Sequence, residues 1–353
     1  MRLVGALVLA VMSMARPSAG QTVNVRLDDP APFSALGLSE NELEQIITDQ
    51  VRALYGVSDL PTFLRLSANA QSLVSRGLGV DYASNPSGFL FGVAVSGALD
   101  AGDADLDELD DLRDFDLANF DRAVPIGVGA QISLMVGYNF KAAGLPELTL
   151  YANGMVLPLT VGVEAGDYSG DFRNFGVHAQ YKLVRPFGNV VFSWGGLDVT
   201  SGLQFSEMVL DLGSNPLRTS LPISANGVEV DVSTVVETGR IELVQTAWTV
   251  PIEVTTNVRF LYVLSLFGGF GLDLNFGRAA LRADIQSQDI RAGGQTVGAF
   301  SVSADDDNGP TTAVFRFLFG AQVHLGPIKV FGQLNVLTEQ LALGGAAGLR
   351  FLF

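Results

Sequence analysis

The chain of 353 residues has no cysteine, carries charge on only 16% of its residues and lacks an apolar run of helix length. Without cysteine it cannot be a disulfide scaffold, so a secreted form must be held by its core or by backbone ladders. The most apolar stretch, residues 260–272, contains three glycines and is shorter than the ~20 residues that a transmembrane helix needs. These absences exclude a helical membrane protein and a small disulfide-rich domain.

Residues that carry catalysis are also scarce. His178 and His324 are the only histidines, and the sequence has neither a Gly-x-Ser-x-Gly elbow nor a His-Glu-x-x-His zinc motif. The net charge is −16, with 37 acidic against 21 basic residues, which disfavours binding to nucleic-acid phosphates. We therefore expect neither an enzyme nor a nucleic-acid partner.

The chain is instead rich in glycine and in apolar residues that alternate with small or polar ones. It has 40 glycines and a mean hydropathy of +0.33. In residues 341–353 the apolar Leu349, Phe351 and Phe353 alternate with smaller or charged residues such as Arg350, which is the two-residue period of a β-strand. The ending on Phe353 resembles the closing strand of Gram-negative outer-membrane β-barrels. In those proteins the terminal Phe is the signal read by the barrel assembly machinery.

The same alternation recurs from residue 88 to the end, with large apolar residues on one face of each predicted strand and polar ones on the other. We predict an all-β fold, an antiparallel transmembrane β-barrel of about 12 strands (roughly 10–14) over residues 88–353, with its apolar face towards lipid. A soluble β-sandwich gives the same alternation with the apolar face inside. The polar stretches 214–227 and 286–310 are expected to be loops. By parity, the lumen is lined by Gln131, Lys141, His178, Gln180, Lys182, Glu253, Asn257, Arg259, Asp273, Arg316, Gln322, His324, Lys329, Gln333 and Arg350.

Two segments precede the predicted strands. Residues 1–20 have a basic start, an apolar core and a small-residue cleavage site, which predicts a secretory signal peptide and export to the outer membrane. Residues 21–87 are expected to begin as extended chain and to continue as a helical segment. Ser39 and Glu42 form a capping-box pattern ahead of one amphipathic helix, and a second helix is predicted over 61–76. The helices are expected either to pack in the periplasm or to plug the barrel.

The stretch just before the first predicted strand has small residues followed by Asn85-Pro86. It is similar to the end of the N-terminal hatch in the long-chain fatty acid transporter family, where an Asn-Pro-Ala element follows a small-residue segment. Ser87 stands in place of that alanine. The resemblance implies that the preceding helices occupy the lumen and that apolar residues such as Phe63 contact a hydrophobic ligand.

Residues 100–121 hold ten acidic side chains against one basic one, Arg113. Carboxylates at this density can bind Ca²⁺ or Mg²⁺, and such ions at the outer surface would bridge to lipopolysaccharide phosphates. Asp103, Asp105 and Asp107 are the candidate ligands. A solvated acidic loop that binds no metal explains the same composition. No other cofactor is expected.

Together these patterns predict an outer-membrane channel or transporter for passive uptake of small molecules, hydrophobic ones among them, surrounded by outer-membrane lipid and lipopolysaccharide. The alternative is a closed structural or surface-binding barrel with an acidic, cation-binding loop. The predicted lumen carries charges of both signs, so it suits either a wet pore or ion pairs across a closed interior.

Overall fold

The computed structural model describes residues 21–36, 39–55, 60–84, 86, 88–103, 126–144, 147–163, 166–214, 217–225, 228–292 and 294–353. The predicted signal peptide, Asn85, Asp105 and Asp107 lie outside the described residues. Neither described helix of the chain is long and apolar enough to cross a membrane.

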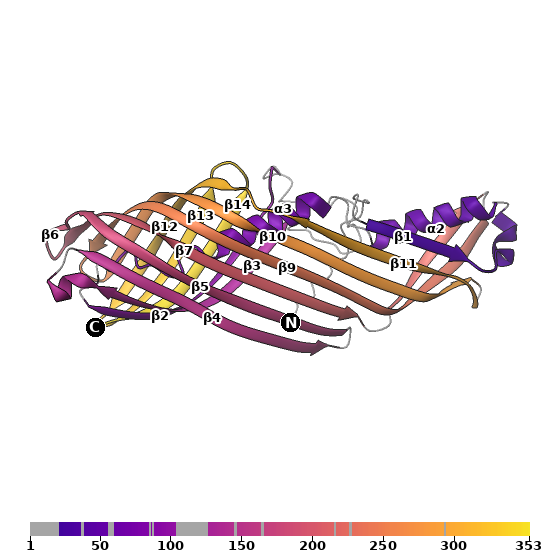
Figure 1. Ribbon diagram of the computed structural model, residues 1–353, viewed down its shortest axis with the longest axis horizontal. Helices are drawn as coiled ribbons and strands as arrows, with labels where there is room; N and C mark the ends of the chain where they lie inside the picture. The colour runs from indigo at the N-terminus through magenta and orange to yellow at the C-terminus, as the bar shows by residue number, and fades with distance from the viewer. Residues whose placement is uncertain are drawn as a thin grey trace.

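Ten antiparallel strands close into a ring, because β10 pairs with β9 on one side and with β12 on the other (Figure 1). The predicted barrel fold is confirmed, with ten strands at the lower limit of the expected range. The ring consists, in order of pairing, of β10 (Leu264–Ala292), β12 (Ala313–Leu325), β13 (Ile328–Leu337), β14 (Ala342–Leu352), β2 (Phe89–Asp100), β3 (Gly127–Asn139), β4 (Leu148–Val163), β5 (Gly166–Val184), β7 (Phe192–Ser214) and β9 (Val228–Phe260).

The register shows how the ring closes. A row of paired neighbours leaves β10 at Leu264, passes through β12, β13, β14 and β2, and reaches Leu134 on β3. It continues through β4, β5, β7 and β9 and returns to β10 at Phe276, twelve residues beyond Leu264. Such a stagger requires the strands to tilt by roughly 40° from the barrel axis, which is within the usual range.

The two faces of the wall are apolar outside and polar inside. On β12, Phe315, Phe317 and Phe319 are 54%, 56% and 47% exposed, while Arg316 between them is buried. A soluble sandwich would bury the phenylalanines, so that alternative is wrong. An exposed belt of large apolar side chains around a closed ring is the surface that a transmembrane barrel presents to lipid.

Strands β9 and β10 are much longer than the others, with 33 and 29 residues. Beyond the ring they pair with β8 (Leu217–Ala225) and β11 (Gln295–Asn308), and β11 pairs in turn with β1 (Gln21–Leu27). We call this five-stranded extension, together with η1 (Ala31–Leu36) and α2 (Glu40–Tyr55), the outer module. The expectation of loops at 214–227 and 286–310 is wrong for most of both stretches, and a strand at 21–27 was not expected.

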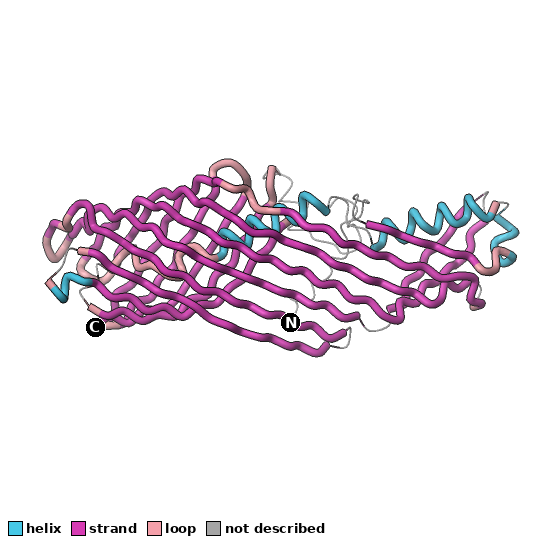
Figure 2. Tube along the Cα trace, viewed as in Figure 1, coloured by secondary structure: helices cyan, strands magenta, loops and turns pink. Residues whose placement is uncertain are grey.

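The outer module has an apolar core of its own. Leu43 and Ile47 of α2 pack with Val23 and Leu27 of β1 and with side chains of the long strands such as Ile285. Figure 2 shows α2 lying along the extension, far from the ring. The polar sequence of β8 and β11 is held as strand because β9 and β10 offer free backbone edges and one buried face.

The second helix, α3 (Leu60–Val74), lies inside the ring, where most of its side chains are buried, polar ones included. The chain continues from it through residues 75–84 along the lumen towards the start of β2 at Phe89. We call residues 60–84 the plug. The short links η3 (Phe140–Ala143), β6 (Phe187–Gly188) and Gly326-Pro327 gather at the end of the barrel that holds the C-terminus, opposite the outer module (Figure 1).

Candidate functional site

The plug fits the wall because two glycines of β3 leave room for its backbone. A Cβ atom on Gly127 would lie 2.1 Å from the carbonyl of Leu66, and one on Gly129 would lie 2.9 Å from the carbonyl oxygen of Ala70. Ser96 Oγ donates to the carbonyl of Val74 at 2.6 Å. The helix therefore lies directly on the strand, at a separation that only glycine allows.

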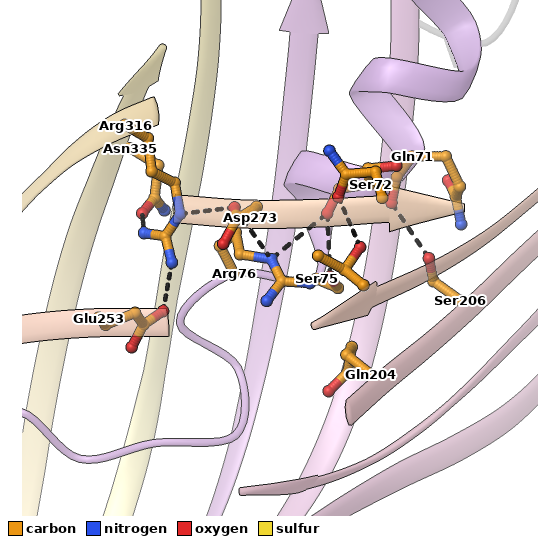
Figure 3. Close-up of polar contacts among 12 residues, drawn as sticks. Gln71, Ser72, Ser75, Arg76, Gln204, Ser206, Glu253, Asp273, Arg316 and Asn335 are labelled. Carbon is orange, nitrogen blue, oxygen red and sulfur yellow. Dashed lines mark hydrogen bonds and ion pairs between the residues drawn. The ribbon is translucent and has the colours of Figure 1, made fainter. Parts of the chain in front are cut away.

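One buried cluster of charges joins the wall to the end of α3 (Figure 3). Arg316 Nε donates to Asp273 Oδ2 at 2.7 Å, its Nη1 donates to Asn335 Oδ1 at 2.7 Å, and its Nη2 donates to Glu253. Arg76 of the plug lies 3.7 Å from the same Asp273 oxygen. Two guanidinium groups thus face two carboxylates in a part of the lumen closed to solvent.

Tyr82 extends this cluster to the part of the plug that follows α3. Its hydroxyl donates to Glu253 Oε2 at 2.8 Å, and its backbone carbonyl accepts from Asn257 Nδ2 at 2.9 Å. Glu253 therefore accepts hydrogen bonds from a wall arginine and from a plug tyrosine at once. That geometry ties the position of the plug to the charge cluster.

A second buried ion pair lies nearer the short-turn end. Arg350 Nη1 is 3.4 Å from Asp81 Oδ1, and its Nη2 donates to the carbonyl of Val80 at 2.6 Å. The guanidinium carbon also lies 3.6 Å from the centre of the Phe331 ring, a cation–π distance. Arg259 Nη2 adds hydrogen bonds to the carbonyls of residues 83 and 84 at 2.9 and 3.0 Å.

The buried charges of these contacts balance, with Arg76 and Arg316 beside Asp273 and Glu253 and with Arg350 beside Asp81, while Arg259 lies on backbone carbonyls. Burying an ion is costly unless an opposite charge and hydrogen bonds compensate, so each of these groups depends on its partners. The wall side chains also satisfy plug carbonyls that have no helix or ladder partner. We call these ion pairs and hydrogen bonds between plug and wall the lock. Its plug residues are Arg76, Asp81 and Tyr82, and its main wall residues are Glu253, Asp273, Arg316 and Arg350.

The structure places most of the predicted lumen residues inside the ring, on the face that surrounds the plug. Arg259, Lys182 and Lys329 are partly exposed near the short-turn end. Lys141 is not a wall residue: it belongs to η3, its side chain is 59% exposed and its Nζ lies 2.7 Å from Glu147. The buried members are Gln131, His178, Gln180, Glu253, Asn257, Asp273, Arg316, Gln322, His324, Gln333 and Arg350.

Three residues of the lock come from the plug and were not among the predicted site residues: Arg76, Asp81 and Tyr82. Arg76 and Asp81 are isolated charges within an otherwise small or apolar stretch, and that isolation was the available signal. Phe63, expected to meet a ligand, instead packs in the core of the outer module.

The other candidate positions give less. Pro86 is buried beside a cavity of about 100 Å³ at the short-turn end, which Glu147 and Asp198 also line. Asp103 is exposed, and the described residues contain no group of three metal-ligating side chains. Phe353 is exposed next to β2, with its ring 6.2 Å from that of Phe91.

Comparison with known proteins gives one family. The family described as Lsa36-like matches residues 32–353. No curated protein matches the chain.

Among solved structures, the translocator domain of the autotransporter NalP from Neisseria meningitidis is 10% identical, with a TM-score of 0.32 over 80% of this chain and 93% of that one. A Pseudomonas aeruginosa FadL homologue is 8% identical, with a TM-score of 0.24 over 81% and 97%. LpxR from Salmonella typhimurium is 11% identical, with a TM-score of 0.25 over 74% and 100%. Likenesses this low carry no argument about function.

Proposed function

The chain belongs to the Lsa36-like family, and we propose that it is a closed outer-membrane barrel that anchors the outer module at the cell surface for binding. The observation that carries the proposal is the plug itself. Its first residues, Leu60, Phe63 and Leu64, are part of the core of the outer module. Its last residues are held to the wall by Asp273, Glu253 and Arg350. One segment thus fills the lumen and fixes the module to the barrel.

The exposed apolar belt supports placement in a membrane, and the predicted signal peptide and terminal Phe support the outer membrane. Outer-membrane barrels have short turns on the periplasmic side and larger structures outside. The links at the end with the C-terminus are short, so the outer module faces the exterior in this proposal. Lipopolysaccharide and the barrel assembly machinery remain the expected partners in the membrane.

Charged side chains lie on the outer surface where the outer module joins the ring. Arg240 lies 2.5 Å from Asp211, and Arg282 lies between Glu242 and Asp305 at 3.8 and 3.7 Å. The side chains of Arg240, Arg282 and Asp305 are 68%, 66% and 81% exposed. Exposed ion pairs contribute little to stability. A charged surface of this kind suits contact with another macromolecule, and the proposal assigns no catalytic step to the chain.

Gated uptake is the second candidate function. It is favoured by the chemistry of the lock: the plug is held by hydrogen bonds and ion pairs, and water can replace such contacts when the plug moves. In that case the closed structure is the resting state of a channel for small molecules.

Two epitope insertions test the proposed arrangement. Gly294, in the turn between β10 and β11, and Gly326, in the turn between β12 and β13, both have positive φ and open space around them. We expect antibody to label the Gly294 insertion on intact cells, and the Gly326 insertion only after the outer membrane is permeabilised. Equal labelling of both on intact cells contradicts the arrangement.

The binding role is tested with cells that display the R240E/R282E variant. We expect weaker attachment to surfaces and to other cells, with unchanged outer-membrane permeability. Altered permeability with unchanged attachment instead favours gated uptake.

A further inference from the structure

Among the residues that the structure describes, the barrel wall is split between β3 and β4. Their pairing runs from Asn139 to Leu134 on β3 and stops there, at Gly154 of β4, although β3 continues to Gly127 and β4 to Val163. Beyond this point β3 remains paired with β2, and β4 remains paired with β5. Figure 1 shows β4 and β5 continuing side by side towards the lower right.

The split begins inside the apolar belt. Leu134, at its lower end, is 55% exposed, and Val156, on its β4 side, is 69% exposed. The paired row that contains Leu134 climbs by roughly 3 Å per strand at this tilt, and it reaches Phe276 five strands later. The split therefore faces the half of the bilayer nearer the outer module. An open strand edge at that depth is tolerated only where it is covered or lines a cavity.

Side chains from β5 hold the lower end of the split. Asn174 Nδ2 donates to the carbonyl of Ile132 at 2.6 Å, and Ser133 Oγ donates to Asn174 Oδ1 at 2.9 Å. A side chain thus takes the place of the strand that would otherwise pair with Ile132. The plug crosses behind the split: Gln71 N lies 3.3 Å from the Cβ position of Gly129, and Gln71 O accepts from Ser206 Oγ at 3.1 Å (Figure 3).

Two glutamines at this crossing have unused hydrogen-bonding groups. Gln71 and Gln131 are 1% and 3% exposed, and neither the amide nitrogen nor the amide oxygen of either side chain has a partner among the described residues. Continuing the β3–β4 register would bring Gln131 opposite Leu157, whose row on β5 and β7 is Phe172 and Met208. Unpaired buried amides next to apolar side chains form a polar spot on an apolar lining, a combination that is costly unless a ligand or solvent supplies hydrogen bonds.

We propose that the split binds an uncharged single-chain amphiphile from the bilayer. Its head hydrogen-bonds to Gln71 and Gln131, and its chain lies along Ile132 and Val156 in the lipid. An amide both donates and accepts, so a hydroxyl head, which does the same, matches it. The gap opens along one strand edge, which suits one chain rather than two. This inference is independent of the surface-binding role of the outer module.

Cysteine pairs test the split. Val136 and Ala152 are paired below it, whereas Ile132 and Val156 would be the corresponding pair above it. In the full-length protein we expect V136C/A152C to oxidise to a disulfide, because paired strands bring Cα atoms within bonding range, and I132C/V156C to stay reduced. Ready oxidation of I132C/V156C overturns the proposal.

Photolabelling tests the ligand. A long-chain fatty alcohol with a photoactivatable group in its chain is added to the full-length protein in micelles, and the labelled residues are identified by mass spectrometry. We expect labelling to concentrate at Ile132 and on β4 beyond Gly154, and to fall about fivefold in Q71M or Q131M, the loss of one hydrogen bond. The matched control is Q286M, an exposed glutamine of the outer module, which leaves labelling unchanged. Labelling spread evenly over the apolar belt, or unaffected by Q71M and Q131M, refutes the site.

Discussion

Replacing Arg316 with Met tests how much the buried charge cluster, which Arg76 and Tyr82 join from the plug, contributes to the stability of the barrel. Met keeps much of the length and volume of the arginine but removes the hydrogen bonds to Asp273, Glu253 and Asn335. Two carboxylates then remain buried with Arg76 as their only nearby guanidinium, at 3.7 Å from Asp273. Breaking a buried ion pair from one side typically costs about 3–5 kcal/mol. We expect R316M to lower the free energy of unfolding by that amount.

Arg282→Met is the matched control. Arg282 also lies between two carboxylates, Glu242 and Asp305, but its side chain is 66% exposed, and it contacts them only at 3.8 and 3.7 Å. Exposed pairs of this kind contribute at most ~1 kcal/mol. The two variants therefore differ in burial rather than in the residue removed.

The assay is urea unfolding of refolded protein in lipid vesicles, followed by gel mobility without boiling, in which folded barrels migrate differently from unfolded chain. A second variant, R316M/E253Q, removes the surplus carboxylate, leaves Arg76 beside Asp273 and is expected to recover most of the loss, because a charge-balanced cluster avoids a buried unpaired ion. Equal losses for R316M and R282M refute the reasoning, and so does an R316M/E253Q variant as unstable as R316M.

Three further predictions concern the plug and the outer module. The intact chain is expected to conduct no ions in a planar bilayer, whereas a chain lacking residues 21–85 conducts; conductance of the intact chain contradicts the closed lumen. Gly127→Val is expected to open a conductance as well, because its side chain meets the Leu66 backbone, whereas Gly332→Ala, with no atom within 4 Å of its Cβ position, leaves the barrel closed. Ser39→Ala is expected to speed amide exchange at the start of α2 about fivefold. Hydrogen bonds from Ser39 hold the pKa of Glu42 below its ordinary value, so this stabilisation is present above the ordinary pKa and is lost as pH falls through the lowered one; an unchanged pH profile of exchange in S39A contradicts this.

The wall was predictable from the sequence because the alternation of apolar and polar residues within each strand identifies the two faces of that strand. Phe315, Arg316 and Phe317 reveal their faces without knowledge of any neighbour. The strand number was harder, since β9 and β10 continue past the membrane without a change of period, and the two additional strands β8 and β11 have the composition of loops. β8 and β11 form strands because they pair with the long strands β9 and β10, and this pairing depends on tertiary structure rather than on their own sequence.

The lock could be predicted only in half. Parity places Arg316, Glu253 and Asp273 inside the ring, but nothing in the sequence pairs Arg350 with Asp81, which is 269 positions away. Such a contact depends on where the plug lies in the barrel. Helix propensity predicts that α3 forms, but it does not predict this position. Lys141 was wrongly placed in the lumen because alternation assigns faces only within a strand, and β3 ends at Asn139. Asn139 caps the following 3-10 helix, where its side chain accepts a hydrogen bond from the Lys141 amide.

The course of the plug has a consequence for the order in which the protein forms. The chain passes lengthwise through the ring, with β1 and α2 emerging at one end and β2 beginning at the other. The ring is sealed where β14 meets β2, the two ring strands that lie furthest apart along the chain. A helix with its side chains is about 10–12 Å across, and α2 belongs to the folded outer module, so threading after sealing is blocked by size. The wall must therefore close around a plug that is already in place. Substitutions that disturb the plug are expected to lower the yield of assembled barrel before they lower its stability.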